Sequence, residues 1–507
     1  MMKQIVFSLG LVSVLVTGCA APQPTPHTFS LLYNEKESVP LQEDWLILEA
    51  YKERRSVGLD VRTADDADYE GAIIEILESG NVPDIVLKAY PRSVEGYAAE
   101  GVLLPFSDYE DLMPHFRTYI ADRGLQSEVD KLRLENGKYY ILPGFQRRIQ
   151  VQQWIYRRDL FEAHGLGTPG TYDELFDALV ILKKAYPDTA PLTACWGGAH
   201  LFAMMGAGYG IPAGWSGTRH YNVEMDRWHY APVTDNYRAF LGFLSRSYDA
   251  GILDPDTFSQ SVDDYTAKLV DGRGLVTVSW ITSGFSSWND ELNENGHPEG
   301  EWAPLPVPES TWGLRALPPV DPFKKGLIVP SPVMNEPYLE DLLRFLDWAV
   351  YSEEGRELTA WGIEGVTFEE RDDGKAFLSH VKTPKNPEGT VDATAEYGLN
   401  TLFDLTENEA YEDYKKPPEI TAFLKASLEA GETADMPPRL ELGSDAIDAT
   451  GIIQEGLDAY VAESTRGFIT GDLSIEEDWD DYAAELERRG YETLEEIWNS
   501  TWSDQSS

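Results

Sequence analysis

The segment of residues 137–175 constrains the fold most, because a Pro-Gly stop within it separates a predicted edge strand from a predicted strand and helix. Residues 139–142 are typical of an edge strand in a β-ribbon, which a Pro-Gly pair stops. Residues 151–156 predict a strand, and Thr171 lies three residues before Glu174, the capping-box spacing that begins a helix. The segment is either an ordinary strand-to-helix connection or the place where one lobe ends and a second begins.

Strands and helices alternate over the first ninety residues, which predicts parallel strands in an α/β lobe. The expected strands are 28–34, 59–63 and 83–87, and the expected helices include 45–51 and 69–78. Ligands of such sheets lie beyond the carboxyl ends of the strands. The candidate ligand contacts at these ends are Asn34, Glu35, Lys88, Tyr90 and Arg92.

Length and charge restrict the classes of function. A chain of 507 residues is too long for one ordinary domain, so two or more lobes are expected. The 41 Lys and Arg residues against 87 Asp and Glu residues give a net charge of −46. Because such a surface repels phosphate groups, nucleic acid and anionic lipid are excluded as partners of the folded part.

The N-terminus resembles a bacterial lipoprotein signal. Lys3 precedes an apolar run, residues 5–16, that is too short to span a membrane and ends in a lipobox-like Val-Thr-Gly-Cys. The resemblance implies a signal peptide at 1–18, lipidation of Cys19 and a Pro-rich tether at 19–27. The alternative is an uncleaved helix or a chance Gly-Cys pair. With Cys19 acylated, Cys195 has no disulfide partner and is expected to be buried and unreactive.

Several phrases of the chain resemble one family, the extracellular solute-binding proteins that feed sugar-importing ABC transporters. The phrases are VPDIV, YRRDLF with TYDEL, KGLIVP, YSEEG with GIEGV, and FITG with WDDY, in that order. The resemblance implies a two-lobed, periplasmic-binding-protein-like (type II) α/β fold with extra C-terminal helices. It places lobe 1 at 28–145 and 328–362, and lobe 2 at 146–327 and 363–507.

The resemblance also implies where a sugar would lie. Trp196, Trp280 and Trp361 match pocket-lining passages of the family, and the apolar C–H face of a pyranose packs well on an aromatic ring. Core packing is the alternative for each ring. Polar groups that satisfy the sugar hydroxyls are expected beside the crossovers. The additional polar candidates are Gln146, Arg147 and Glu364.

Arg147 and the neighbouring Arg148 stand out in a chain that is poor in cations. They are either a solvated pair that balances acidic neighbours or a bidentate grip on a sugar carboxylate. Both a neutral and a uronic-acid-containing oligosaccharide are therefore candidate ligands.

No metal or cofactor is expected. Relatives that resemble alginate-oligosaccharide binders insert an Asp/Asn-rich calcium loop before the strand that contains PLT, whereas residues 183–190 carry a single carboxylate. Calcium takes about six to eight oxygen ligands, so this segment cannot hold it.

Two classes of function remain. The first is a non-catalytic, monomeric binding protein, anchored by lipid outside the cytoplasm, that presents an oligosaccharide to the permease of an ABC importer. The second is a secreted carbohydrate-active enzyme, a glycosidase or lyase, although the chain contains no HExxH or GxSxG motif. A binder of a non-sugar solute with the same fold is a further alternative.

Overall fold

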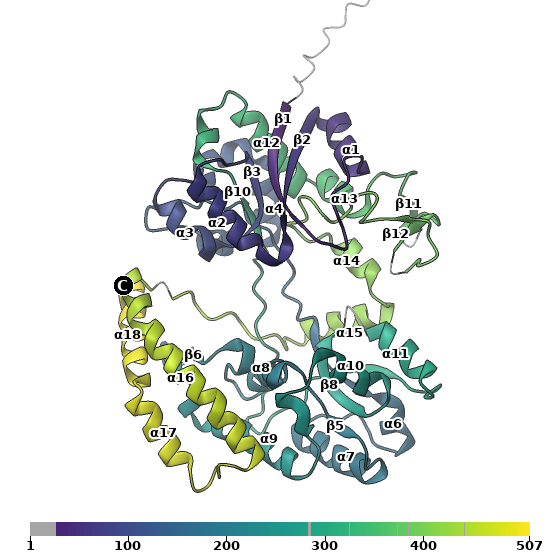
Figure 1. Ribbon diagram of the computed structural model, residues 1–507, viewed down its shortest axis with the longest axis vertical. Helices are drawn as coiled ribbons and strands as arrows, with labels where there is room; N and C mark the ends of the chain where they lie inside the picture. Colours follow the sequence, from purple (N-terminus) through teal and green to yellow (C-terminus); the bar gives the residue numbers. More distant parts are fainter. Residues whose placement is uncertain are drawn as a thin grey trace, which may run out of the picture. The chain divides into compact units, whose positions relative to one another are not determined.

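The computed structural model describes residues 27–281, 285–323, 325–372, 374–383, 385–440 and 442–506. The expected signal peptide, Cys19 and most of the tether lie outside these ranges. The described chain forms two compact units (Figure 1). Unit 1 comprises residues 27–143 and Lys325–Thr406, and unit 2 comprises Gly144–Lys324 and Glu407–Ser507. The chain therefore passes between the units three times.

Unit 1 is built on a four-stranded sheet in the order β10-β3-β1-β2. Strand β1 pairs in parallel with both β2 and β3, while β10 is antiparallel to β3. The three parallel strands match the expected ones to within two residues at each end. The bounds are β1 (His27–Glu35), β2 (Val57–Asp65), β3 (Ile85–Ala89) and β10 (Gly326–Ile328).

Helices pack around this sheet and against each other, with α1 and α2 both contacting β2, and α4 and α13 contacting α12 (Figure 1). The helices of unit 1 are α1 (Leu46–Arg55), α2 (Tyr69–Ser79), α3 (Pro91–Ala99), α4 (Pro114–Arg123), α5 (Gln126–Asp130), α12 (Leu339–Tyr351) and α13 (Glu353–Trp361). Its short 3-10 turns are η1 (Asp66–Asp68), η2 (Phe106–Leu112) and η7 (Ser331–Asn335).

The expected edge strand at 139–142 is not a strand. Leu142 forms a single bridge with Leu327, and the remaining residues of the run are irregular. Tyr139, Tyr140 and Ile141 are nevertheless buried, because the run is held in the core of unit 1. The apolar pattern of residues 139–142 thus indicates burial and not strand pairing.

Residues 363–406 belong to unit 1, whereas the sequence analysis assigned them to lobe 2. The reason is packing with residues far away in the chain: the Phe403 ring lies 5.7 Å from that of Tyr51 and 5.4 Å from that of Phe345. Thr406 donates a 2.7 Å hydrogen bond to the carbonyl of Val350. The segment also contains two small ribbons, formed by β11 (Phe368–Arg371) with β12 (Gly374–Phe377) and by β13 (Val381–Lys382) with β14 (Val391–Asp392).

Unit 2 has a sheet in the order β5-β8-β4-β9, in which β5 and β8 are parallel and β4 is antiparallel to both of its neighbours. The bounds are β4 (Gln152–Arg157), β5 (Ala190–Leu192), β8 (Gly274–Trp280) and β9 (Trp302–Leu305). The remaining elements before the C-terminal helices are α6 (Arg158–Ala163), α7 (Tyr172–Ala185), η3 (Trp196–Gly198), α8 (Ala199–Gly208), η4 (Gly214–Ser216), β6 (Arg219–Asn222), β7 (Arg227–Tyr230), η5 (Ala231–Val233), α9 (Asp235–Asp249), η6 (Pro255–Phe258), α10 (Val262–Val270), α11 (Phe285–Glu294), α14 (Glu409–Lys415) and α15 (Pro418–Glu429).

The predicted capping box of α7 is present. The Thr171 hydroxyl accepts a 3.1 Å hydrogen bond from the backbone N–H of Glu174. The Glu174 carboxylate reaches back to the N–H of Gly170, one residue before the cap, at 2.7 Å. Leu175, Leu179 and Leu182 are buried on one face, as their spacing predicts.

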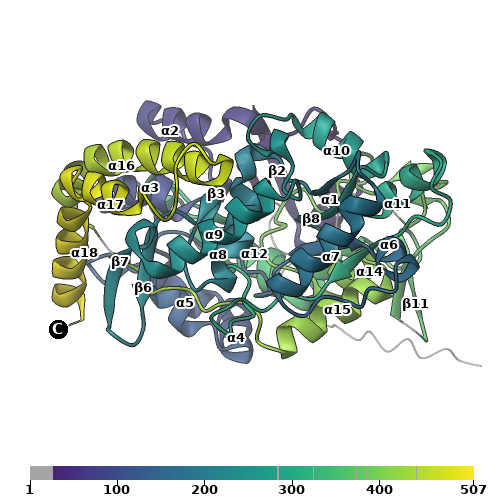
Figure 2. The same ribbon diagram turned by 90° about the horizontal axis from the view of Figure 1, so that it is seen from below.

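The expected extra C-terminal helices form one flank of unit 2, beside α9 and the β6–β7 hairpin (Figures 1 and 2). They are α16 (Ser444–Thr470), α17 (Trp479–Arg488) and α18 (Tyr491–Gln505). Helix α18 covers the edge of β7, where Asn499 accepts from the Trp228 N–H at 2.8 Å and donates to its carbonyl at 2.9 Å. Helical side chains thus satisfy a strand edge that would otherwise be open. No helix in the described ranges is long and apolar enough to cross a membrane.

A buried ionic network fixes the end of β5. The Asp254 carboxylate accepts from the Lys268 ammonium at 2.7 and 2.9 Å and from the Thr193 hydroxyl at 2.6 Å. The side-chain amide of Gln260 donates to the Ala194 carbonyl at 2.6 Å. Because Asp254 is 1% exposed, its charge depends on these donors in place of water. The network therefore holds the backbone immediately before Trp196.

Removing the ammonium from this network should destabilise unit 2. We expect Lys268→Met to lower the free energy of unfolding by about 3–5 kcal/mol, because it leaves a buried carboxylate without its counter-charge. The matched control is Lys425→Met, since Lys425 is 74% exposed and 4.0 Å from Glu429, and we expect a change below about 1 kcal/mol. Urea unfolding followed by circular dichroism measures both. Equal losses in the two variants would contradict the assigned role of Asp254.

Candidate functional site

Two of the predicted tryptophans meet at one edge of the unit 2 sheet. Trp280 is the last residue of β8, and Trp196 follows β5 in the turn η3. Since β5 and β8 are parallel, their carboxyl ends lie at the same edge. The two indole rings are 5.7 Å apart and nearly perpendicular, at 88°. The structure thus brings together side chains that are separated by more than eighty residues in sequence.

Two further rings complete a cluster that we call the aromatic platform, defined by Trp196, His200, Trp215 and Trp280. The Trp215 ring lies 5.3 Å from that of Trp196 and 6.1 Å from that of Trp280. Trp196 is 42% exposed and Trp215 is 50% exposed. Indole rings that only fill a core are rarely exposed to this extent. The platform thus presents a surface suited to the apolar face of a ligand.

The backbone at Trp196 is strained. Its φ of 51° lies in the left-handed region, which is costly for a large side chain, and Gly197 and Gly198 continue in that region with φ of 64° and 79°. A side chain at Gly198 would meet the Phe202 ring at 2.6 Å. The conformation costs about 1–3 kcal/mol and persists because the network around Asp254 holds the preceding residues. Strain of this kind is typical of a residue positioned for binding.

A close backbone approach brings Trp215 to the platform. Gly214 has φ of 53°, and a Cβ atom there would lie 2.0 Å from the carbonyl oxygen of Ala199 at the start of α8. Any other residue would push η4 away from α8. Gly214 therefore fixes the position of the Trp215 ring next to that of Trp196.

His200 forms the buried base of the platform. It is 2% exposed, and its ring lies 5.0 Å from that of Trp215 and 4.8 Å from that of Trp280. Burial lowers the pKa of His200 to about 4, so the imidazole is neutral at pH 7. The Nε2 atom has no hydrogen-bond partner within the described part of the chain. The base of the platform is thus aromatic and uncharged.

A pocket of about 790 Å³ adjoins the platform at Trp280. Its walls come from the segment before β4, the segment after Pro318, and helices α14 and α15, all within unit 2. The Gln152 backbone pairs with Trp280 across β4 and β8, which joins the pocket wall to the platform. The polar residues that line the pocket are Gln146, Arg147, Gln150, Gln152, Glu407, Glu409, Glu412, Asp413, Lys416, Thr421 and Lys425.

Arg147 lines this pocket, but its guanidinium is committed to two carboxylates. Nε donates to Glu407 at 3.0 Å, and a terminal nitrogen donates to Asp413 at 2.9 Å. Burial acts to lower the pKa of Arg147, but the hydrogen bonds and charges of Asp413 and Glu407 outweigh it and raise the pKa. Arg147 thus serves to neutralise the acidic side of the pocket. Gln146 is exposed beside it and donates to the carbonyl of Asp321 at 3.0 Å.

Lys416 is a cation of the same pocket that the sequence analysis did not identify. Its side chain is 5% exposed, and Nζ donates to the Glu412 carbonyl at 2.6 Å and lies 3.5 Å from the Glu412 carboxylate. Burial lowers the pKa of Lys416, and Arg147 acts in the same direction, while Glu412 opposes them. Each cation of the pocket thus has an acidic partner within unit 2.

The candidates of unit 1 lie at the carboxyl edge of its sheet, as expected. Asn34 is 2% exposed and donates to the Asp66 carboxylate. Glu35 accepts from the N–H of Leu41 at 2.8 Å. These contacts are internal to unit 1, so both side chains at the end of β1 support the sheet edge.

The end of β3 carries the other candidates of this edge. The Lys88 ammonium lies 5.7 Å from the centre of the Tyr33 ring, and its backbone has φ of 55°. Tyr90 precedes α3 and lies under the ammonium of Lys325 at 5.1 Å. Arg92 is in the first turn of α3. Lys88, inside β3, and Tyr90, just after it, are thus partly exposed side chains that contact other residues of unit 1.

Trp361 does not contribute an exposed ring, which contradicts its expected role in ligand contact. It is 1% exposed in unit 1, and its ring stacks on that of Phe377 at 5.1 Å and 28°. The Phe368 ring lies 5.9 Å away. The ribbon β11–β12 supplies both partners and makes Trp361 a core residue. Glu364 is exposed in the following turn, bridged to Phe368.

Cys195 is buried, as expected, and burial raises the pKa of its thiol to about 12. It is therefore not a nucleophile at neutral pH. Within the described ranges, no three His, Cys, Asp or Glu side chains are grouped in a way that could hold a metal ion.

Comparison with known proteins places this geometry in context. The chain is 23% identical over 479 residues to the fructooligosaccharide ABC transporter substrate-binding protein FusA of Streptococcus pneumoniae serotype 4, covering 88% of this chain and 84% of FusA. It is 22% identical over 526 residues to lipoprotein LipO of Bacillus subtilis, covering 97% and 95%. The crystal structure of the alginate-binding protein AlgQ2 without calcium ion superposes with a TM-score of 0.69 at 17% identity, covering 95% of this chain and 99% of AlgQ2.

The structural similarity establishes the expected periplasmic-binding-protein-like type II fold. The family model described as bacterial extracellular solute-binding protein matches residues 46–320, more than half of the chain. The chain also has two units that it joins by three passages, and its match to LipO covers 97% of its length. This protein therefore belongs to the bacterial extracellular solute-binding protein family.

Proposed function

We propose that this protein binds an oligosaccharide through the aromatic platform and the adjoining pocket of unit 2, and delivers it to the permease of an ABC importer. The observation that carries the proposal is the pair of exposed indoles, Trp196 and Trp215, beside a pocket lined by amide and charged groups. A pyranose needs both an apolar surface for its C–H face and polar groups for its hydroxyls. The name of FusA supports the same class of ligand.

The anchoring and location are part of the proposal. We infer that Cys19 carries lipid and anchors the protein, as a monomer, to the bacterial cell membrane outside the cytoplasm. The lipobox-like residues before Cys19 and the name of lipoprotein LipO support this. The ligand leaves the protein chemically unchanged, in contrast to the product of a glycosidase or lyase.

The pairing of charges in the pocket favours a neutral oligosaccharide over a uronate. Arg147 already binds Glu407 and Asp413, and Lys416 is bound to Glu412. A sugar carboxylate would have to displace one of these acids or lie next to them, and both cost electrostatic energy. Uncharged hydroxyls meet no such penalty.

Replacing an exposed indole should weaken sugar binding without unfolding the protein. We expect Trp215→Ala to raise the Kd for the best-bound neutral oligosaccharide about tenfold, or ~1.4 kcal/mol, because a stacking face is lost. Trp312→Ala is the matched control, since Trp312 is also an indole of unit 2, is 49% exposed and is not part of the platform. Isothermal calorimetry against a panel of oligosaccharides measures the Kd values, and chromatography of the same mixtures detects any cleavage. Equal effects of the two substitutions would argue against the platform, and cleavage products would favour the enzyme.

Arg147 should support stability and not the choice of an acidic ligand. We expect Arg147→Ala to destabilise unit 2 by about 1–2 kcal/mol, because two partly buried carboxylates lose a donor. We also expect the native protein to bind a neutral oligosaccharide at least tenfold more tightly than a uronic-acid oligomer of the same length. Thermal unfolding and calorimetry check the two parts. A native preference for the uronate that disappears in Arg147→Ala would assign the guanidinium to the ligand.

His200 should make unit 2 less stable in mild acid. Its pKa in the folded state, about 4, lies below the ordinary value of 6.5, so between these values the unfolded chain binds the proton and the folded chain does not. The free energy of unfolding should therefore be highest above about pH 6.5 and fall by up to ~3 kcal/mol as the pH decreases toward 4. Urea unfolding at pH 5 and pH 7.5 should show a smaller difference in His200→Gln than in the native protein. The surface variant His164→Gln serves as the control, and an unchanged pH dependence in His200→Gln would refute the assignment.

A further inference from the structure

A half-buried amide, that of Gln152, lies in the wall of the unit 2 pocket. Gln152 is the first residue of β4, and the sequence analysis did not identify it as a candidate contact. Its backbone N–H is hydrogen-bonded, but no residue in the described ranges forms a hydrogen bond with its side-chain amide. The carbonyl oxygen and the NH2 group of this amide can therefore both bind water or a ligand.

Gln152 lies directly beside the aromatic platform. It is paired with Trp280 across the antiparallel strands β4 and β8. Residues that face each other across such strands have their side chains on the same face of the sheet, with Cβ atoms about 4.5–5.5 Å apart. The Trp280 ring belongs to the platform and also lines the pocket. The Gln152 amide thus extends from the sheet next to an indole that the proposed sugar contacts.

The backbone at Gln152 is held by its neighbours. The Gln150 side chain accepts from the Gln152 N–H at 3.1 Å and donates to the Pro318 carbonyl at 3.3 Å. The Ile281 N–H donates to the carbonyl of Val151 at 3.1 Å. These bonds tie the start of β4 to the end of β8 and to the segment around Pro318. A fixed backbone lowers the entropy cost of binding a ligand through the side chain.

Neighbouring polar side chains of the pocket already have partners within unit 2. Gln146 donates to the carbonyl of Asp321 at 3.0 Å. Arg147 and Lys416 are both paired with acidic residues. A ligand that bound one of these groups would first have to displace its partner, which costs free energy. Gln152 offers a neutral donor and acceptor without that cost.

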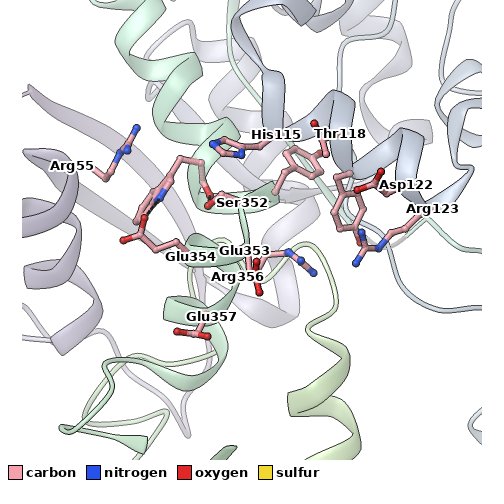
Figure 3. Close-up of a pocket in the computed structure, with 13 residues that line it drawn as sticks. Arg55, His115, Thr118, Asp122, Arg123, Ser352, Glu353, Glu354, Arg356 and Glu357 are labelled. Carbon is pink, nitrogen blue, oxygen red and sulfur yellow. Dashed lines mark hydrogen bonds between the residues drawn. The ribbon is translucent and has the colours of Figure 1, made fainter. Parts of the chain in front are cut away.

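The pocket of unit 1 is lined by a different kind of group. It has a volume of about 780 Å³ and lies between the end of α1, helix α4 and the junction of α12 with α13 (Figure 3). None of the described residues that line it is Asn or Gln. Glu354 is paired there with Arg54. Glu357 is paired with Lys375. A neutral amide beside an exposed aromatic cluster is thus a feature of the unit 2 pocket.

We propose that Gln152 determines which sugar the site accepts, by binding two neighbouring equatorial hydroxyls of the pyranose that contacts Trp280. The amide oxygen accepts from one hydroxyl, and the NH2 group donates to the next. This inference rests on the proposed function and adds a class of ligand to it. The class is an oligosaccharide whose pyranose units carry adjacent equatorial hydroxyls, as in the gluco configuration.

Stacking on an indole makes this recognition depend on configuration. When the C–H face of a pyranose lies on the ring, its equatorial hydroxyls point outward in the plane of the sugar, toward a side chain beside the indole. An axial hydroxyl points along the normal of the sugar ring, so the Gln152 amide cannot bind it in the same position. An epimer with one axial hydroxyl therefore leaves half of the amide without a partner, and its affinity falls.

The test compares trisaccharides that differ in configuration. Cellotriose and β-1,4-mannotriose have the same linkage and composition, but the hydroxyl next to the anomeric carbon is equatorial in the first and axial in the second. Maltotriose is a second gluco probe with a different linkage. Isothermal calorimetry with the full chain should show that the tighter-binding gluco sugar binds at least tenfold more tightly than mannotriose. Equal or tighter binding of mannotriose overturns the proposal.

A variant assigns the preference to Gln152. Gln152→Met keeps the length of the side chain and removes the amide, and the half-buried position is compatible with folding. We expect it to weaken binding of the preferred gluco sugar at least tenfold and binding of mannotriose less than twofold. A merely structural role would reduce both affinities together, so equal losses for the two sugars, or an unchanged ratio, overturn the proposal.

The matched control is Gln454→Met. Gln454 is a half-buried glutamine of unit 2 that donates to Thr218 at 3.1 Å and to Asp458 at 2.7 Å, and it lines neither the pocket nor the platform. We expect both sugar affinities to stay within twofold of those of the native protein. A loss of the gluco preference in this variant would show that the preference does not come from Gln152, and would overturn the proposal.

The same titrations separate this inference from the proposed function. Binding of another oligosaccharide in preference to both gluco sugars, with no loss in Gln152→Met, would leave the proposed function standing and overturn the role of Gln152. Binding of no oligosaccharide at all would overturn the proposed function, and the role of Gln152 with it.

Discussion

The carboxylate of Asp254 is the contact on which the candidate site depends. It is buried and accepts hydrogen bonds from Lys268 and Thr193. Because Thr193 directly follows β5, these bonds hold the backbone at the end of that strand. From that position the next residues enter the left-handed region and direct the Trp196 ring outward. The energy that this conformation costs is supplied by a buried network that is not part of the aromatic platform. The position of Trp196, on which the proposed sugar contact depends, thus rests on electrostatics buried several residues away from its ring.

The sequence predicted those parts of the molecule that local rules govern. The strands of unit 1 and the cap of α7 follow from periodicity and from the spacing of Thr171 and Glu174. Trp196 and Trp280 could be paired because the carboxyl ends of parallel strands share an edge. Trp215 could not, because the tight approach of Gly214 to α8 leaves no mark in sequence beyond a glycine.

Contacts between distant segments account for the remaining differences. The salt bridges of Arg147 reach Glu407 and Asp413, some 260 residues later, so no local pattern could tell a solvated cation from a neutralised one. The third passage between the units comes after Thr406 and not after residue 362, because Phe403 packs against Tyr51 and Phe345. Trp361 is a core residue and not a ligand contact because Phe368 and Phe377 of the β11–β12 ribbon pack against its ring. In each case the deciding partner is supplied by tertiary structure.

The threefold passage of the chain has a consequence for biosynthesis. Neither unit is continuous: the first is complete only when Thr406 has been made, and the second only with the segment Glu407–Ser507. Asn499 and Glu495 of α18 hold the backbone of β7, and Arg147 meets its acids in the same late segment. A ribosome therefore finishes almost the entire polypeptide before unit 2 can close its core. During that interval the edge of β7 and the Arg147 guanidinium lack the late residues that contact them in the folded unit.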